Sequence, residues 1–395
     1  MDGVRLTVAA ARRFAQYGKI TSGGGGENVL DINALLIEAK KRRASDVHLK
    51  VGSPPVLRVD GRLTRLNGQS VAAADIENAL TTVASDQEIE RFRTTKELDL
   101  DYEMADVSRF RVNVSREDGD LRMVFRLVPL DPWSIDELEL PHVLKEVCKQ
   151  KSGFVLVTGY AGCGKSTTLA AMIDEINSHE PKHIISIEDP IEFLHKDKVG
   201  MVTQRQVGSD TTSFGNGLRA ALRQDPDVIL IGEMRDLETF ETALRSAETG
   251  HLVLSTLHTI NAVESLNRIM DMFPLHRQDE IRKHLASVLR AIISQRLIRR
   301  KDDTGRVAAV EVLIGSATVR EFVETARSFG DIVKLMEEGY STYGMQTFDQ
   351  ALYDLWKKGV VTEETALEAA TSPKNLRLRM DGLAKGLKDV LPGAE

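Results

Sequence analysis

Apolar and polar positions follow two different patterns along the chain. Between Asp46 and Pro129, apolar residues recur mainly at every second position, which predicts short strands at 46–51, 55–60, 62–66, 98–103, 108–115 and 121–127. Helical spacing predicts a helix that follows a capping Asp31, has its apolar face within 32–39 and ends in the basic run 40–43, and a second helix over 73–84. Elements in this order predict a small α+β domain, which we place at residues 29–129.

A different pattern begins after a linker at 130–136. Apolar, β-branched runs are separated by helical segments, as is typical of parallel strands buried on both faces, at 154–157, 183–187, 228–231 and 252–256. Helices are then expected at 262–272 and 278–298, and a last strand at 306–314. We therefore predict an α/β fold with a parallel sheet over 137–315.

The two ends of the chain differ from this core. Residues 316–395 have mainly helical spacing, with a break expected at 341–345, and predict a helical C-terminal region. Arginines interrupt the apolar stretch 4–15, unlike the core of a secretory signal, and a glycine-rich segment follows at 21–27. We expect residues 1–28 to form a flexible N-terminal arm.

A glycine-rich loop lies between the first strand of the α/β core and the helix that follows it. Its sequence from Gly159 to Ser166 matches the pattern G-x-x-x-x-G-K-S of a P-loop. Glycines let backbone N–H groups surround a phosphate, the lysine adds a positive charge, and the serine hydroxyl can reach a Mg²⁺ ion. The nucleotide-binding residues expected from this motif are Gly159, Gly162, Cys163, Gly164, Lys165, Ser166 and Thr167.

Polar residues follow the other predicted strands of the core. Glu188, Glu233 and His258 come just after the runs that end at 187, 231 and 256. Ligands of open α/β sheets bind at the carboxyl ends of the strands, so these side chains should converge on the phosphates. A lone glutamate at a strand end is more often a solvated loop residue, but the P-loop favours the functional interpretation.

Composition narrows the class of protein. Of the 395 residues, 42% are hydrophobic and 28% charged, which is typical of a globular protein. The formal net charge of −7 argues against a general nucleic-acid binder, because such proteins need excess Lys and Arg. Two cysteines cannot form a disulfide framework or a four-cysteine zinc site, which favours the reducing cytoplasm. No apolar run approaches the roughly 20 residues that span a bilayer.

Four motifs in a fixed order give the chain a specific resemblance. They are the P-loop at 159–166, an acidic motif at 188–192, an atypical Walker B motif at 228–236 and a histidine motif running from 249–251 through 257–259. The stretches 45–48, 52–55 and 109–113 match the N-terminal domain of the family that also carries these four motifs. Over about residues 30–380 the chain resembles the type IV pilus retraction ATPases, the PilT and PilU twitching-motility group of the type II/IV secretion ATPase family.

The resemblance implies a RecA-like ATPase core preceded by a PAS-like domain. It also implies ATP and Mg²⁺, and a hexameric motor that converts ATP hydrolysis into depolymerisation of the pilus. Members of the family act as cytoplasmic homohexamers, peripheral at the inner membrane, with a membrane platform protein as partner and a paralogous retraction ATPase as a second expected partner. No nucleic-acid partner is expected.

The family's motifs also assign roles to acidic residues. Glu233 is expected to hold Mg²⁺ together with Ser166, directly or through water. Glu192 is expected to polarise the attacking water, and Glu188 is its rival for that role. Such groups fit phosphoryl transfer, which depends on positioning and charge neutralisation.

Histidines and arginines complete the expected site. His251 and His258 are interpreted through the resemblance as sensors of the γ-phosphate or of a subunit interface, since no third ligand suggests a metal. Arg109 and Arg111 lie on one face of a predicted strand. They either form a surface stripe of salt bridges or complete the nucleotide site across a domain or subunit boundary.

Several alternatives stay open at this point. A nucleic-acid translocating motor and a non-catalytic nucleotide switch are the competing functions. The related assembly ATPases carry a zinc-binding insert with four cysteines, which a chain with two cysteines cannot form, so retraction is favoured over assembly. The stretch from Thr318 to Val323 departs from the Ala-Ile-Arg start expected in the retraction branch, so the assignment to the PilT or the PilU branch stays open. Cys163 is expected among N–H dipoles beside Lys165, which would lower its pKa and make it more reactive than Cys148; the alternative is a small filler residue.

Overall fold

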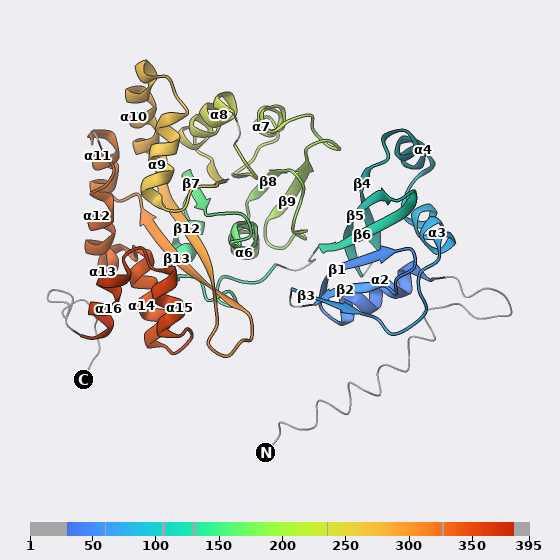
Figure 1. Cartoon of the computed structure of the whole chain (residues 1–395). Coiled ribbons are helices and arrows are strands. Elements are labelled where there is room, and N and C mark those ends of the chain that lie inside the picture. The colour runs from blue at the N-terminus through green and yellow to red at the C-terminus, as the bar shows by residue number, and fades with distance from the viewer. Residues whose placement is uncertain are drawn as a thin grey trace. The chain divides into compact units, whose positions relative to one another are not determined.

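The computed structural model describes residues 30–59, 61–104, 107–128, 132–234, 236–325 and 328–382 (Figure 1). The chain forms two compact units, Met1–Leu130 and Asp131–Glu395. This division falls inside the linker expected at 130–136. The flexible arm expected at 1–28 and the end of the expected C-terminal region lie outside the described residues.

The first unit contains an antiparallel sheet with the strand order β3-β2-β1-β6-β5-β4. Its strands are β1 (Ala44–Lys50), β2 (Val56–Val59), β3 (Arg62–Arg65), β4 (Leu98–Met104), β5 (Ser108–Glu117) and β6 (Asp120–Val128). Its helices are α2 (Ile32–Lys41), α3 (Ala73–Val83) and α4 (Asp86–Thr95).

Alternating burial explains how this sheet forms. Val47 and Leu49 of β1 are fully buried in one core with Leu35 of α2, so this face of the strand packs against a helix. The turn between β5 and β6 has positive φ at both Asp118 and Gly119, 53° and 91°, as a tight hairpin requires. Sequence patterning therefore fixes both the buried face and the hairpin.

The second unit contains a seven-stranded sheet with the order β13-β12-β7-β11-β10-β8-β9. Neighbouring strands are parallel except for the β12–β13 pair. The strands are β7 (Gly153–Thr158), β8 (His183–Glu188), β9 (Met201–Gln206), β10 (Val228–Ile231), β11 (Leu252–Leu257), β12 (Leu289–Arg299) and β13 (Arg306–Ile314). The α/β class with a parallel sheet agrees with the sequence prediction.

Helices cover both faces of this sheet (Figure 1). One core contains residues of α5 (Val143–Cys148) and α6 (Lys165–His179). The other contains residues of α7 (Phe214–Ala221), α8 (Leu237–Glu248), α9 (Ala262–Asp271), α10 (Gln278–Val288), α11 (Ala317–Thr325) and α12 (Ile332–Glu338). The other α-helices of the described residues are α13 (Tyr340–Tyr343), α14 (Phe348–Lys357), α15 (Glu363–Ala369) and α16 (Pro373–Met380), and a short 3-10 helix lies at Leu275–Arg277.

Two predictions about elements of this unit are wrong. The helix expected over 278–298 ends at Val288, and residues 289–299 form β12. β12 lies inside a sheet whose two faces are both covered by helices, so its residues are buried almost without alternation and the strand resembles a buried helix in sequence. The break expected at 341–345 is also shorter, because α13 continues to Tyr343 before the chain turns at Gly344 with φ +70°.

None of the helices in the described part of the chain has both the length and the apolar character needed to cross a lipid bilayer.

Candidate nucleotide-binding and hydrolysis site

The loop between β7 and α6 has the shape of a phosphate cradle. Gly159 has φ +143°, and a Cβ atom there would lie 2.4 Å from Cys163 Sγ and 2.7 Å from the carbonyl oxygen of Gln295. Gly164, at the N-cap of α6, has φ +93°. Both positions therefore favour glycine, and the first N–H groups of α6 have no partner within the helix and are available to an anion.

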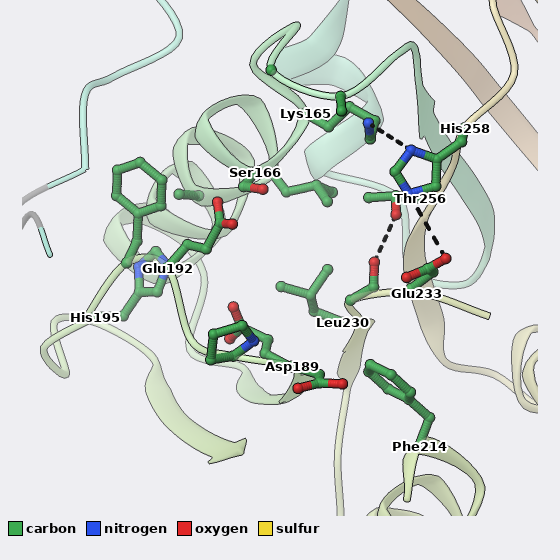
Figure 2. A pocket seen from close by; sticks show the side chains of 18 residues that line it. Lys165, Ser166, Asp189, Glu192, His195, Phe214, Leu230, Glu233, Thr256 and His258 are labelled. Atoms are coloured by element: carbon green, nitrogen blue, oxygen red, sulfur yellow. Dashed lines mark hydrogen bonds and ion pairs between the residues drawn. The ribbon is translucent and has the colours of Figure 1, made fainter. Parts of the chain in front are cut away.

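A cavity of about 270 Å³ opens beside this loop. It lies at the carboxyl ends of β7, β8, β10 and β11, the edge at which α/β sheets bind ligands (Figure 2). The cavity is lined by Ala161, Gly162, Lys165, Ser166, Leu169, Ala170, Glu188, Asp189, Pro190, Glu192, Phe193, His195, Phe214, Leu230, Gly232, Glu233, Thr256 and His258.

Lys165, His258 and Glu233 follow one another along one side of the cavity (Figure 2). The buried Lys165 Nζ donates to the carbonyl oxygens of Gly159 at 2.8 Å and Tyr160 at 3.2 Å, and lies 3.5 Å from His258 Nδ1. An ammonium can only donate, so Nδ1 must accept and the imidazole proton lies on Nε2. That Nε2 is 3.7 Å from Glu233 Oε1. The three groups link the P-loop to the end of β10.

The two carboxyl groups of the acidic motif have different surroundings. Glu188 Oε1 accepts from Ser186 Oγ at 2.6 Å and Gln204 Nε2 at 3.2 Å, and burial raises the pKa of Glu188. Glu192 is exposed and lines the cavity. A solvated carboxylate in the cavity can contact a water molecule, whereas Glu188 is already held by neighbouring side chains.

The residues present fit a magnesium ion that is shared with a nucleotide. Ser166 and Glu233 both line the cavity, as expected. Within the described residues no group of three or more His, Cys, Asp or Glu side chains could hold a metal by itself. Mg²⁺ at nucleotide sites takes one or two protein oxygens together with phosphates and water, so this sparse set suits it.

Comparison with known proteins identifies the family. A model of the family described as "Type II/IV secretion system protein" matches residues 26–331. The chain belongs to the type II/IV secretion system protein family. Within that family it is 42% identical to the type IV pilus retraction ATPase PilT of Pseudomonas aeruginosa, over 88% of this chain and 100% of that protein. It is 38% identical to the type IV pilus ATPase PilU of the same organism, over 88% of this chain and 91% of that protein.

A solved structure of the same group has the same fold. It is the pilus retraction motor PilT with bound ADP, which superposes with a TM-score of 0.79 at 43% identity. The match covers 88% of this chain and 98% of that chain. The predicted resemblance to the PilT and PilU group and the predicted fold class are therefore confirmed.

The P-loop residues expected from the family motif divide into two sets. Gly162, Lys165 and Ser166 line the cavity. The other four do not line the cavity. Three of them shape the loop, namely Gly159, Cys163 and Gly164, and Thr167 is half-buried in the first turn of α6. The roles of all seven remain a prediction.

His251 lies away from the other expected site residues of this unit. It precedes β11, whose first residue pairs with Gly153, so it is at the amino end of the strands, and its Nδ1 donates to the carbonyl oxygen of Ser246 at 2.9 Å. His258 follows the carboxyl end of the same strand and lines the cavity. The two histidines therefore do not converge on one phosphate, because a six-residue strand separates them. A role for His251 at a subunit interface remains a prediction.

Arg109 and Arg111 lie on β5 of the first unit. Both are half-buried, and Arg109 Nη2 forms an ion pair with Asp101 Oδ2 at 2.8 Å. They are not among the residues that line the cavity of the second unit. Their action across a domain or subunit boundary therefore stays a prediction.

The expected pKa of Cys163 is wrong in sign. Its side chain is fully buried, and the loss of hydration raises the pKa of the thiol although Lys165 acts in the opposite direction. Cys148 is also buried, and desolvation raises its pKa as well. The structure thus favours the filler interpretation of Cys163, whose sulfur packs closely against Gly159.

Sequence reasoning missed several residues of the cavity wall, among them Phe193, His195 and Thr256. Phe193 is contacted edge-on by Trp133, with ring centroids 6.4 Å apart. Burial lowers the pKa of His195 to about 4, so its imidazole is neutral at neutral pH. Thr256 ends the run 252–256, and the strand-end rule that indicated His258 could have indicated it too.

Proposed function

We propose that this chain is a motor ATPase that hydrolyses ATP to drive retraction of a type IV pilus. The observation that carries the proposal is the combination of the glycine cradle with Lys165, Ser166, Glu192 and Glu233 around one cavity. The 42% identity to PilT over that protein's whole length adds the retraction function. The PilT structure that it resembles contains ADP, which supports a nucleotide as the ligand.

Each residue then has a physical task. The N–H groups of the P-loop and the ammonium of Lys165 bind the phosphates, and Lys165 exchanges carbonyl contacts for phosphate oxygens. Ser166 and Glu233 would hold Mg²⁺, directly or through water, and the bound ion would supply positive charge beside the phosphates. His258, between Lys165 and Glu233, senses whether the γ-phosphate is present.

Glu192 is the better candidate for orienting the attacking water. Its carboxylate is exposed in the cavity, while one oxygen of Glu188 already accepts two hydrogen bonds and burial raises the pKa of Glu188. A group that orients water needs a free, ionised oxygen near the γ-phosphate. We therefore assign Glu188 to the support of the loop.

The active form is proposed to be a homohexamer at the cytoplasmic face of the inner membrane. Its proposed partners are the platform protein of the pilus machine and a paralogous retraction ATPase. P. aeruginosa has two relatives of this chain, PilT and PilU, which supports a paralogous partner. Arg109 and Arg111 are proposed to act on the nucleotide of a neighbouring subunit.

Three experiments test the proposed function. The purified chain should release phosphate from ATP at steady state, and its nucleic-acid binding in filter assays should be weak and nonspecific at low salt. Deletion of the gene should leave cells with excess surface pili and no twitching. An absence of ATP turnover would instead favour a nucleotide switch, and tight salt-dependent binding of single-stranded DNA would favour a nucleic-acid motor.

A further inference from the structure

The segment that carries Glu192 is held by side chains from the edge strand β9. Residues 189–200 join β8 to β9 as an irregular loop. The N–H of Ile191 donates to Gln206 Oε1 at 3.2 Å. Gln204 Nε2 donates to the carbonyl oxygen of Phe193 at 2.8 Å, and Gln204 Oε1 accepts from the N–H of His195 at 2.9 Å.

The spacing of these contacts matches the geometry of a strand. Gln204 and Gln206 are two residues apart, so they lie on the same face of β9. The loop residues whose backbone they bind, Ile191, Phe193 and His195, are also two residues apart, and they lie on both sides of Glu192. The two glutamine amides therefore supply the hydrogen bonds that a neighbouring strand would otherwise supply.

Gln204 also joins this loop to the end of β8. In the parallel β8–β9 pair, Ser186 is opposite Gln204 and Glu188 is opposite Gln206. Gln204 Nε2 and Ser186 Oγ both donate to Glu188 Oε1, at 3.2 and 2.6 Å. The half-buried Glu188 carboxyl is therefore the anchor to which the Gln204 amide is attached.

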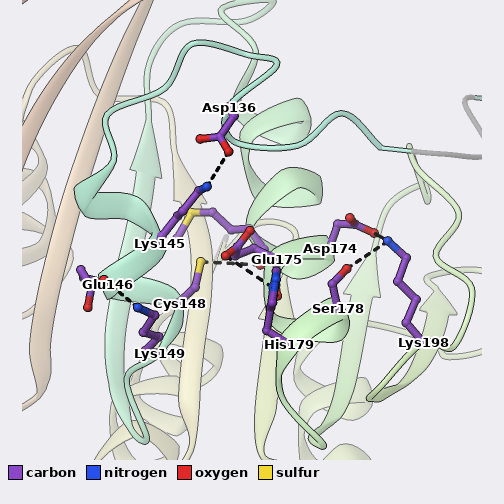
Figure 3. A network of polar contacts seen from close by, with 11 residues as sticks. Asp136, Lys145, Glu146, Cys148, Lys149, Asp174, Glu175, Ser178, His179 and Lys198 are labelled. Atoms are coloured by element: carbon purple, nitrogen blue, oxygen red, sulfur yellow. Dashed lines mark hydrogen bonds and ion pairs between the residues drawn. The ribbon is translucent and has the colours of Figure 1, made fainter.

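The far part of the loop is attached to the P-loop helix. The buried Asn177 of α6 donates through Nδ2 to the carbonyl oxygen of Lys196 at 2.7 Å, and its own carbonyl oxygen accepts from Val199 and Gly200 at 3.0 Å. Lys198 Nζ reaches Asp174 Oδ1 at 2.6 Å and Ser178 Oγ at 3.1 Å on the same helix (Figure 3). The loop is thus fixed to both α6 and β9.

We propose that Gln204 and Gln206 are positioning residues that hold the Glu192 carboxylate at the distance from the phosphate cradle that hydrolysis requires. The inference rests on the proposed function, because it assigns to these glutamines the placement of the group that orients water. A displacement of about 1 Å in a catalytic group can cost roughly a hundredfold in rate. Loosening this backbone should therefore affect turnover more than nucleotide binding.

The first test compares kcat with nucleotide affinity. Gln204→Met keeps the length and volume of the side chain but removes its hydrogen bonds. We expect kcat for phosphate release to fall roughly tenfold to a hundredfold, with the Kd for ADP changed less than about threefold, because the P-loop is untouched. Gln206→Met, which removes the acceptor of the Ile191 N–H, should show a fall of the same kind. Equal losses in kcat and ADP affinity, or no change in kcat, would overturn the proposal.

The matched control is Thr203→Val. Thr203 lies on the opposite face of β9, where its hydroxyl is 3.1 Å from His183 Nε2, so the variant removes one hydrogen bond between the same two strands. Its kcat should stay within about twofold of wild type. A fall as large as that of Gln204→Met would mean that any disturbance of β9 lowers activity, which would contradict a specific positioning role.

A double-mutant cycle tests whether the glutamine acts through Glu192. In a Glu192→Gln background, Gln204→Met should cause little further loss in single-turnover hydrolysis of radiolabelled ATP, since the group that it positions has been removed. An additive further loss would overturn the proposal. If Gln204→Met does not fold, Gln206→Met takes its place in the cycle.

Failure of the proposed function would be seen separately. Wild-type protein that releases no phosphate would overturn the proposed function and this inference together. Active wild type with fully active glutamine variants would overturn the inference alone.

Discussion

Glu188 and Glu192 are both acidic and only four residues apart, but their surroundings give them different properties. Glu188 is held by Ser186 and Gln204 and has a raised pKa, whereas Glu192 is exposed in the cavity. The sequence places both in one motif and cannot separate them, because the donors to Glu188 come partly from β9, a strand that shows no strand pattern. Burial and hydrogen-bond partners, which arise only on folding, give the two carboxyl groups these different surroundings.

The first prediction concerns the residues of the cavity. Lys165→Ala should abolish ATP binding, because it removes the positive charge that contacts the phosphates. Glu192→Gln and Glu233→Gln should keep nucleotide binding but lower turnover roughly a hundredfold, as expected of groups that act mainly in the transition state. Equilibrium binding of a fluorescent nucleotide and steady-state phosphate release measure the two effects. An equal loss of affinity in all three variants would contradict these roles.

The second prediction concerns Cys163. Because the thiol is fully buried and its pKa is raised, N-ethylmaleimide should inactivate the native protein slowly. Cys163→Ser should keep most of the activity and should be inactivated at nearly the same slow rate as wild type. Rapid inactivation of the wild type, prevented by ATP and absent from the serine variant, would instead indicate a reactive thiol in the loop.

Sequence motifs predicted residues that line the cavity but not the residues that hold the surrounding loop by hydrogen bonds. The P-loop pattern and the strand-end rule predicted the group of Lys165, Glu233 and His258 that the cavity brings together. The histidine motif grouped His251 with His258, but a motif gives order along the chain and does not say at which edge of the sheet a residue lies. Gln204 gives no motif signal, since the positioning role proposed for it depends on hydrogen bonds to the backbone of the preceding loop, which form only on folding.

Among the secondary-structure elements, strands with one buried face were easier to predict from the sequence than strands buried on both faces. Strands of the first unit alternate between buried and exposed residues, and their predicted ranges lie close to the observed ones. β12 was predicted as a helix because it is buried on both faces, while α4 was not expected because only Phe92 of that helix is fully buried. A short helix with one apolar contact has no periodic pattern to detect.

A row of polar side chains crosses the buried strands and gives the third prediction. Thr158, Ser294 and Glu311 occupy matched positions on β7, β12 and β13, and Thr158 Oγ1 donates to Ser294 Oγ at 2.9 Å. Glu311 Oε1 accepts from the N–H of Ala262 at the start of α9. Burial raises the pKa of Glu311 from 4.5 to about 7. The carboxyl group therefore favours folding below pH 4.5, and this contribution is lost as the pH rises towards 7.

Glu311→Gln should remove this pH dependence while keeping an acceptor for the N–H of Ala262. We compare the free energy of unfolding of the variant with that of wild type at each pH. This difference should be more favourable to the variant at pH 8 than at pH 5, by on the order of 1 to 3 kcal/mol. Urea unfolding of both proteins at the two pH values measures the difference. The same stability difference at both values would mean that Glu311 does not titrate in this range.

At the scale of the whole molecule, the family match covers both units and gives the fourth prediction. If Arg109 acts on the nucleotide of a neighbouring subunit, Lys165→Ala subunits that keep their arginines should partly restore phosphate release by Arg109→Ala subunits in mixed hexamers. The control subunit carries both Lys165→Ala and Arg109→Ala and should restore nothing. No restoration at any mixing ratio would count against action between subunits.

The contact between Trp133 and Phe193 makes tryptophan fluorescence a reporter of the site. The chain has two tryptophans, so Trp356→Phe leaves Trp133 as the sole indole emitter. Trp133 is 49% exposed and touches the ring next to Glu192, which lines the cavity. Nucleotide binding that reshapes the loop from Asp189 to Gly200 should therefore shift its emission, and stopped-flow traces would time that movement against phosphate release. An unchanged spectrum at saturating nucleotide would mean that this part of the loop is already set before the nucleotide binds.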